Sequence, residues 1–214
     1  MISIIIPAYN EENYIKRTLD SIKQQPYKDY EIIVILDSCK DNTEKIAKTF
    51  TKNIYKINKR NVSAAENIGA KKAKGNILVF LDADSTISKN LLFEVEKACK
   101  KYIGGTTKTL SLENKLKAHL IWFIGNLGRN FFMAASGFKF CKKQAFPGFP
   151  ENIHIAEDTF FMKRLKKQGK LKYIKSAHIK TSARRFEKQG YIKTICAQFK
   201  GFFIKTSKRQ KPLK

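Results

Sequence analysis

Two pairs of acidic residues mark the places where this sequence could do chemistry. Asp82 and Asp84 stand one residue apart, directly after the apolar run at 76–81. Two carboxylates at the end of a buried strand can hold a hard divalent cation while it bridges phosphate oxygens. Turns also use Asp often, so it is the position after an apolar strand that makes this pair a candidate metal site.

The second acidic pair, Glu157 and Asp158, opens a predicted helix over 156–168. Exposed N–H groups and the helix dipole favour carboxylates at a helix start, so simple capping is one interpretation. The functional interpretation is a general base that takes a proton from a reacting hydroxyl group.

Basic residues near the C-terminal end offer a site for an anion. Arg184 and Arg185 could bind a diphosphate through their forked donors, or they could belong to a solvated basic face. His178 stands alone and is interpreted as structural, with a metal or phosphate contact as the alternative.

Alternating strands and helices must position these groups. Because the predicted strands are uninterrupted apolar runs, we expect an α/β fold with a mostly parallel central sheet and helices on both faces. Ligands bind at the carboxyl ends of such strands, where Glu11, Asp37 and Asp82 follow three of them. The first half predicts strands at 2–6, 30–36, 53–57 and 76–81, and helices at 13–24, from 41, at 63–73 and at 91–101.

The second half is less regular and ends in a basic amphipathic segment. One apolar stripe runs through residues 186–207, which predicts a last helix followed by a short tail. The other elements predicted in the second half of the chain are helices at 115–133 and 156–168, strands at 138–141, 171–174 and 178–180, and a turn at 147–150.

Positive charge is concentrated in the second half of the chain. The 214 residues carry a net charge of +25, of which residues 108–214 contribute +20 and residues 163–214 contribute +17. This indicates an anionic partner such as nucleic acid, a phosphorylated substrate or anionic lipid, although solubility or a Lys-rich source organism would also explain it. A content of 43% hydrophobic and 12% aromatic residues excludes a disordered basic tail.

The sequence predicts a cytoplasmic protein. Pro7 and the acidic residues after it end the first apolar run, so no secretory signal is expected. The most apolar window, 116–134, contains charged residues and is a poor membrane span. Four scattered cysteines without metal spacing are expected to be reduced.

Six short motifs occur in order along the chain, each of them weak alone. They are IIIPAYNEE at 4–12, LDSCKDNT at 36–43, Arg60-Asn61 with NIGA at 67–70 and AKG at 73–75, FLDAD at 80–84, ASG at 135–137 with FPGF at 146–149, and EDT at 157–159 with KRL at 163–165 and Gly169.

Together these motifs resemble glycosyltransferase family 2, over roughly residues 2–185. The resemblance implies a GT-A fold, with a nucleotide-sugar half at 1–107 and an acceptor half at 108–185. Residues 186–214 would form a separate amphipathic helix and tail, either packed on the domain or lying on an anionic membrane surface.

The resemblance also implies roles for individual residues. Asp158 would be the base that activates the acceptor, with Glu157 beside it, and Gly137 would lie in the acceptor-side loop. Asp82, Ala83 and Asp84 would bind the nucleotide-sugar and Mg²⁺ or Mn²⁺, with Asp84 favoured as the direct metal ligand. The expected nucleotide-binding residues are Pro7, Tyr9, Glu11, Asp37, Arg60 and Asn67.

The implied reaction is transfer of a sugar, with inversion, from a UDP- or GDP-linked donor to an acceptor sugar or polyprenyl-linked lipid. Leu36 stands where the second strand motif often has an acid, so the choice between UDP and GDP stays open, and no Q-x-x-R-W sequence occurs. Arg184 and Arg185 occupy a comparable late position and are predicted to bind diphosphate.

Two other functions are weighed against this one. A sugar-phosphate nucleotidyltransferase would need a Gly-rich basic loop after the first strand, where this chain has PAYNEEN. A nucleic-acid-binding protein would interleave basic residues with exposed aromatics, whereas here the aromatics follow helical core spacing. We therefore expect no nucleic-acid partner.

Overall fold

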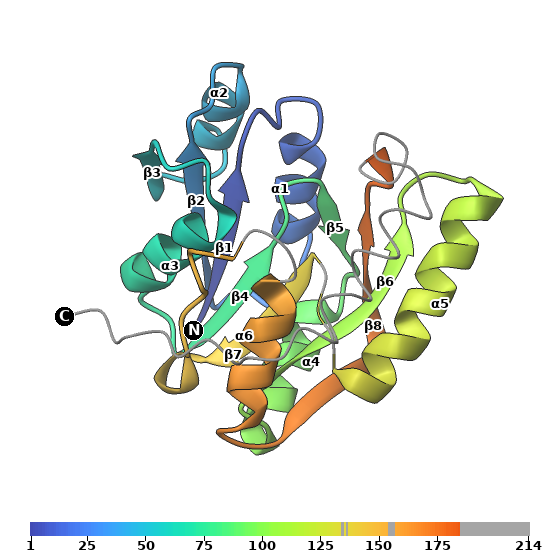
Figure 1. Cartoon of the computed structure of the whole chain (residues 1–214). Helices are drawn as coiled ribbons and strands as arrows, with labels where there is room; N and C mark the ends of the chain where they lie inside the picture. Colours follow the sequence, from blue (N-terminus) through green and yellow to red (C-terminus); the bar gives the residue numbers. More distant parts are fainter. Residues whose placement is uncertain (134, 136, 154–156, 185–214) are drawn as a thin grey trace.

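Eight strands form one sheet, in the order β3-β2-β1-β4-β7-β6-β8-β5. The computed structural model describes residues 1–133, 135, 137–153 and 157–184, and Figure 1 shows helices in front of and behind the sheet. The strands are β1 (Ile2–Ala8), β2 (Tyr30–Asp37), β3 (Ile54–Ile57), β4 (Ile77–Leu81), β5 (Ser85–Ile87), β6 (Gly104–Ser111), β7 (Phe138–Lys142) and β8 (Leu171–Thr181).

The helices lie close to the ranges that the apolar periodicity predicts. The predicted and observed bounds agree for the helix at 91–101. For the other helices each predicted end differs from the observed one by one or two residues. The helices are α1 (Ile15–Lys23), α2 (Thr43–Lys48), α3 (Val62–Lys72), α4 (Leu91–Lys101), α5 (Leu116–Phe132) and α6 (Glu157–Lys166), with a short 3₁₀ turn at Lys143–Ala145.

The first half of the sheet is parallel, which confirms the predicted α/β class. β1 pairs with β2 and with β4, and β2 pairs with β3, all in parallel. Ile4, Ile5 and Ile6 are fully buried although their side chains alternate between the two faces. Such strands must be apolar throughout because both of their faces are covered.

The second half of the sheet introduces the antiparallel pairings. β7 runs antiparallel to both β4 and β6, and β5 runs antiparallel to β8, whereas β6 and β8 are parallel. The sheet is therefore mixed. The predicted strands at 171–174 and 178–180 are one strand, β8, whose pairing with β6 shifts register between Thr107 and Lys108.

Sequence periodicity does not predict β6 and β5. β6 reads GGTTKTLS and has no apolar alternation. Two of its buried hydroxyl groups bond across the sheet instead: Thr106 donates to the carbonyl of Phe138, and Thr107 to those of Ile174 and Ala177. Tertiary hydrogen bonds thus make a polar segment a good interior strand.

Two apolar clusters cover the two faces of the sheet. One joins the strands to α1, α2 and α4, and includes Ile15, Leu19 and Leu91. The other joins them to α3 and α6, and includes Phe80 and Phe161. Helices on both faces are as predicted, and the two layers hold the strand ends in a fixed arrangement.

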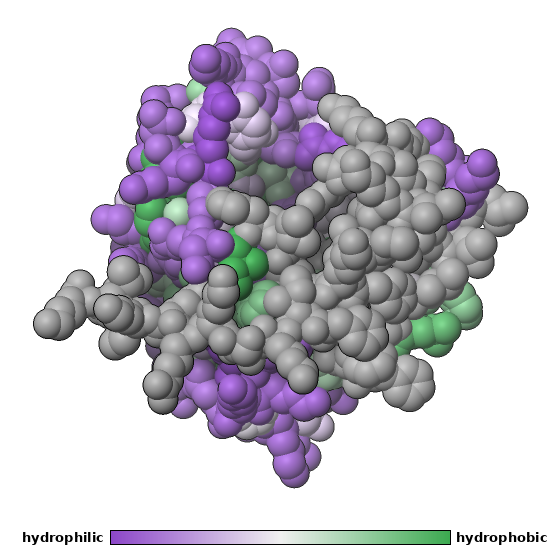
Figure 2. All heavy atoms as spheres, viewed as in Figure 1, coloured by the Kyte–Doolittle hydropathy of each residue, from purple (hydrophilic) through white to green (hydrophobic). Residues whose placement is uncertain are grey.

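The remaining helix, α5, packs along β6. The amide of Asn126 bonds to both the N–H and the carbonyl of Thr109. Phe123 and Leu127 are 63% and 50% exposed, and apolar atoms lie on the side of the molecule where α5 runs, whereas hydrophilic residues surround α2 (Figure 2). Within the part of the chain described, no helix is long and apolar enough to cross a membrane.

Two predictions on domain organisation concern this region. The expected boundary between a nucleotide-sugar half and an acceptor half, at 107/108, falls inside β6, so both halves share one sheet. The predicted helix at 186–207 and the tail lie outside the described residues.

Candidate active site at the carboxyl edge of the sheet

The ends of several strands meet at one edge of the sheet. β1, β2 and β4 are parallel, so the residues that follow them lie at the same edge. Because β7 runs antiparallel to β4, its start lies there too, and the N–H of Asp82 donates to the carbonyl of Gly137 at 3.1 Å. The acidic residues predicted after β1 and β4 therefore come together with Gly137.

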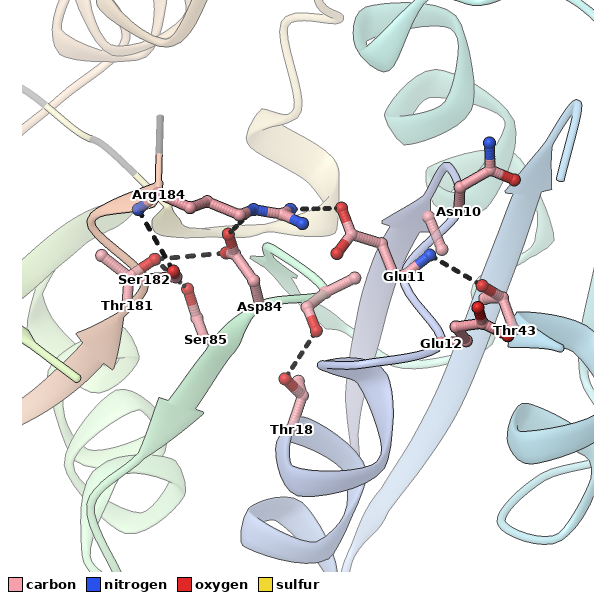
Figure 3. Close-up of polar contacts among 12 residues, drawn as sticks. Asn10, Glu11, Glu12, Thr18, Thr43, Asp84, Ser85, Thr181, Ser182 and Arg184 are labelled. Atoms are coloured by element: carbon pink, nitrogen blue, oxygen red, sulfur yellow. Dashed lines mark hydrogen bonds and ion pairs between the residues drawn. The ribbon is translucent and has the colours of Figure 1, made fainter. Parts of the chain in front are cut away.

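A salt-bridge network of three residues lies at this edge (Figure 3). The guanidinium of Arg184 donates from Nη2 to Oε1 of Glu11 at 2.5 Å and from Nε to Oδ2 of Asp84 at 3.1 Å. Oδ1 of Asp84 accepts from the hydroxyl of Thr181 at 3.2 Å. Glu11 and Asp84 were predicted to bind the donor, and the structure shows them sharing one cation from the end of β8.

The aromatic ring of Tyr14 supports this network. The guanidinium carbon of Arg184 lies 4.4 Å from the ring centroid, and that of Arg17 lies 4.7 Å from it. Desolvation raises the pKa of Glu11 against the lowering effect of Arg184, and among the described residues Oε2 of Glu11 is buried without a hydrogen-bond partner.

Asp82 links the two acidic motifs electrostatically. Desolvation raises its pKa to about 7, with Lys139 opposing the shift and the charges of Asp84, Asp158 and Glu157 adding to it. Gly137, which bonds to Asp82, and Lys139, which contacts Asp158, are two residues apart along the chain. The tertiary structure thus links the pair after β4 to the pair that begins α6.

Asp158 itself contacts a buried lysine. Nζ of Lys139 donates to Oδ1 of Asp158 and lies 2.7 Å from Oε1 of Glu66. Lys139 is 2% exposed and Glu66 1%. Sequence reasoning missed both residues, although one signal was present: the strand segment FKFCK places a charged residue inside an apolar run.

Asp37 shapes the loop that follows β3. Its carboxylate accepts from the backbone N–H groups of Lys59, Arg60 and Asn61 at 2.8–2.9 Å. Burial alone would raise the pKa of Asp37, but these bonds and one from Ser38 bring it below its usual value. The contact between Asp37 and a nucleotide base stays a prediction.

The other predicted nucleotide-binding residues lie on neighbouring loops. Arg60 has a φ of 46° and is exposed, with its guanidinium carbon 5.5 Å from the ring of Tyr9. The side-chain amide of Asn67 accepts from the N–H of Phe149 and donates to the carbonyl of Phe149. It also donates to the carboxylate of Glu151. Pro7 lies near the end of β1, where it is partly buried.

Small residues allow the edge to pack closely. The carbonyl of Ala83 accepts from the hydroxyl of Thr18 at 2.7 Å. Gly137 has a φ of +75°, and a Cβ built there would lie 3.3 Å from Oδ2 of Asp82. Both the backbone conformation and the close contact favour a glycine at this position.

The carboxylates at this edge fit a hard divalent cation by their chemistry. Mg²⁺ and Mn²⁺ favour oxygen ligands, which Asp82 and Asp84 offer, with donor phosphates and water to complete the shell. In the described part of the chain, no three His, Cys, Asp or Glu residues lie together as a metal site.

Two predicted basic contacts have different outcomes. Arg184 contacts carboxylates in this structure, and Arg185 lies outside the described residues. His178 is partly buried, and burial together with Lys180 and Lys108 lowers its pKa. Its backbone bonds to Ser88 join β8 to the segment after β5, and the structural role of its imidazole stays a prediction.

Known proteins with similar sequences carry glycosyltransferase names. The chain is 35% identical over 106 residues to the glycosyltransferase GlyA of Streptococcus pneumoniae, which is 47% of this chain and 15% of GlyA. It is 40% identical over 92 residues to an uncharacterized glycosyltransferase of Rickettsia prowazekii, which is 42% of this chain and 29% of that protein. The chain thus matches less than a third of either relative's length.

Solved structures share the fold at low sequence identity. S. aureus TarS 1–349 in complex with UDP-GlcNAc gives a TM-score of 0.66 at 18% identity, with 83% of this chain and 57% of TarS 1–349 covered. The mannosyltransferase PcManGT from Pyrobaculum calidifontis, in complex with GDP-Man and Mn²⁺, gives 0.69 at 18% identity, with 93% and 64% covered.

The family model for glycosyl transferase family 2 matches residues 3–166. This range begins in β1 and ends with α6, so it contains both acidic pairs and the edge at which they meet. The match confirms the resemblance that the six motifs indicate: the chain belongs to glycosyl transferase family 2.

Proposed function

We propose that this chain is an inverting glycosyltransferase that moves a sugar from a UDP- or GDP-linked donor to an acceptor hydroxyl or a lipid phosphate. One observation carries the proposal: β7 links the two acidic pairs, because Gly137 before it bonds to Asp82 and Lys139 within it contacts Asp158. A donor-binding carboxylate pair and a base must lie on either side of one reacting carbon, and this edge of the sheet has both.

Asp158 is the proposed base, with Glu157 beside it at the start of α6. As the acceptor oxygen bonds to the anomeric carbon, its proton passes to Asp158. The bond from that carbon to the diphosphate oxygen breaks, and its electron pair leaves with the nucleoside diphosphate. Attack from the face opposite the leaving group inverts the configuration.

The donor diphosphate is proposed to lie against Asp82, Ala83 and Asp84. Mg²⁺ or Mn²⁺ bound there would neutralise charge that develops on the departing diphosphate. Arg184 offers a second cation for the same charge, together with Arg185, once donor oxygens replace its present contact with Glu11. Gly137 borders the acceptor side of this space.

The nucleotide is proposed to lie over the ends of β1 and β2. Relatives of the same fold are solved with UDP-GlcNAc and with GDP-Man, which supports a donor of either class. The residues proposed to line this part are Pro7, Tyr9, Glu11, Asp37, Arg60 and Asn67.

A thermal-shift panel tests the donor class. UDP-, GDP- and dTDP-sugars are added to the full chain with and without Mn²⁺. We expect one nucleotide to raise the melting temperature in a metal-dependent manner, and Asp84→Ala to abolish that rise. A flat panel with a folded protein would contradict the proposal.

The acceptor is proposed to be membrane-borne, such as a polyprenyl-linked lipid, with the enzyme peripheral on the cytoplasmic face of the membrane. The net charge of +17 over residues 163–214 supports this placement. Sedimentation with anionic and with neutral vesicles at low salt tests it. We expect binding to anionic vesicles alone. Protein that stays unbound in both samples would refute the membrane proposal but would say nothing against the proposed donor chemistry.

A further inference from the structure

Lys139 is a charged residue in the middle of an interior strand. Its neighbours in β7, Phe138 and Phe140, belong to the apolar cluster on the α1 and α4 side of the sheet. Because side chains alternate along a strand, Lys139 faces the other side, where α3 and α6 pack. Cys141, two residues on, lies in the apolar cluster of that side.

The ammonium group is held by groups from two helices. It donates to Asp158 of α6 and lies 2.7 Å from Oε1 of Glu66 of α3. The ring of Phe149 lies beside it, with its centroid 5.0 Å from Nζ. Groups from α3, from α6 and from the loop before α6 thus contact the single charge of Lys139.

Such a buried charged cluster contributes little to the stability of the fold. Desolvation of buried ions costs several kcal/mol, and well-packed apolar residues in their place are often equally or more stabilising. Of its two carboxylate contacts, the ammonium lies nearer to Asp158 than to Glu66, whose pKa burial raises to about 8. The arrangement therefore directs one positive charge at the proposed base.

We propose that Lys139 is a positioning residue for Asp158, and that Glu66 holds Nζ of Lys139 from the opposite side. This inference rests on the proposed function, in which Asp158 is the base. The contact engages Oδ1 of Asp158, so Oδ2 is the oxygen that takes the acceptor proton. A misplacement of about 1 Å in such a group costs about 100-fold in rate.

The test compares two substitutions that differ in charge. Lys139→Met keeps an unbranched side chain one atom shorter and removes its charge, whereas Lys139→Arg keeps a charge. The activity measured is Mn²⁺-dependent release of UDP from UDP-GlcNAc or of GDP from GDP-mannose, with water as acceptor. UDP and GDP dissociation constants are measured on the same samples.

We expect Lys139→Met to lower kcat about 100-fold, with the nucleoside diphosphate dissociation constant changed less than threefold. The kcat of Lys139→Arg should be at least tenfold higher than that of Lys139→Met. Lys142→Met, at a lysine of the same strand outside this cluster, should stay within threefold of the parent protein. A purely structural role would instead move kcat, affinity and melting temperature together.

A crystal structure of Lys139→Met gives a second readout that needs no donor. The proposal expects the Asp158 carboxylate to leave its present position, and an unmoved carboxylate overturns it. If Lys139→Met does not fold, Lys139→Met/Glu66→Met removes both buried charges and takes its place in both measurements.

The outcomes separate this inference from the proposed function. An active parent protein, an inactive Asp158→Asn and a fully active Lys139→Met would reject the inference alone. A parent protein that releases neither nucleotide, or an active Asp158→Asn, would reject the proposed function, and the position of Asp158 in Lys139→Met would then decide whether Lys139 positions it.

Discussion

Arg184 and Glu11 are 173 positions apart in the sequence, and Nη2 of Arg184 lies 2.5 Å from Oε1 of Glu11. The same guanidinium contacts Asp84, so the end of β8 supplies the cation for carboxylates that follow β1 and β4. In this conformation Arg184 offsets part of the negative charge that the donor is proposed to meet.

Replacement of Arg184 should therefore weaken donor binding. Arg184→Ala is expected to reduce the affinity for UDP or GDP with Mn²⁺ about tenfold, or about 1.4 kcal/mol, because one charge-assisted contact to the diphosphate is lost. Titration calorimetry measures this change. Arg17→Ala is the matched control, since Arg17 also stacks on Tyr14 but contacts no carboxylate within the described part of the chain. Unchanged affinity and normal turnover in Arg184→Ala would rule out the diphosphate role.

Gly137→Ala should disturb the site as well as the fold. The φ of +75° makes a side chain cost about 1 kcal/mol, and the new Cβ would lie 3.3 Å from Oδ2 of Asp82. Gly148→Ala is the control, because its φ is +71° but its nearest neighbour is Asn67 Oδ1 at 3.8 Å. We expect urea unfolding to show similar losses of stability for both, and Mn²⁺-dependent donor binding to weaken only in Gly137→Ala. Equal binding in the two variants would contradict the close approach to Asp82.

Glu66 should make the free energy of unfolding depend on pH. Its pKa is about 8 in the folded protein and near 4.5 when unfolded, so the folded state binds the proton more tightly. The stability that this proton supplies is present below about pH 4.5 and is lost as the pH rises to about 8. The slope is at most about 1.4 kcal/mol per pH unit for one proton.

Glu66→Gln should flatten that slope between about pH 5 and 8, as measured by urea unfolding at several pH values. Glu44→Gln is a surface control, since Glu44 pairs with Lys48 and Lys56 on the outside of the molecule. Parallel curves for the parent protein and Glu66→Gln would show that Glu66 does not hold a proton in the interior.

Asp37→Asn should loosen the loop at 59–61. The variant loses one acceptor oxygen of a carboxylate that binds three backbone N–H groups, which we expect to cost about 1–3 kcal/mol at pH 7. The folded pKa of Asp37 is lowered, so this contribution is present above about pH 4 and lost as the pH falls through the folded pKa. Faster hydrogen exchange at Lys59, Arg60 and Asn61 is the direct measurement, with Asp20→Asn as an exposed control. Unaltered exchange at these three amides would be evidence against the role of Asp37 in the loop.

Much of the fold follows from local patterns. The apolar runs of β1, β2 and β4 predict their own burial, because a strand covered on both faces has no place for polar side chains. The positions of Asp82 after β4 and of Glu157 and Asp158 at the start of α6 were likewise predictable. β6 was not predictable, because Thr106 and Thr107 are buried with their hydroxyl groups bonded to segments that are distant in the sequence.

The sequence by itself determined which segments alternate, where their carboxyl ends fall, and which acidic pairs follow them. Only the tertiary structure decided that Arg184 reaches Glu11 and that Lys139 faces Asp158. Both pairings depend on strand order: β7 lies beside β4 and its residues alternate between two faces, whereas β8 ends at the edge where β1 ends. Hydrophobic periodicity shows that a strand is buried but not which strands become its neighbours, so contacts between charges on different strands appear only when the sheet is assembled.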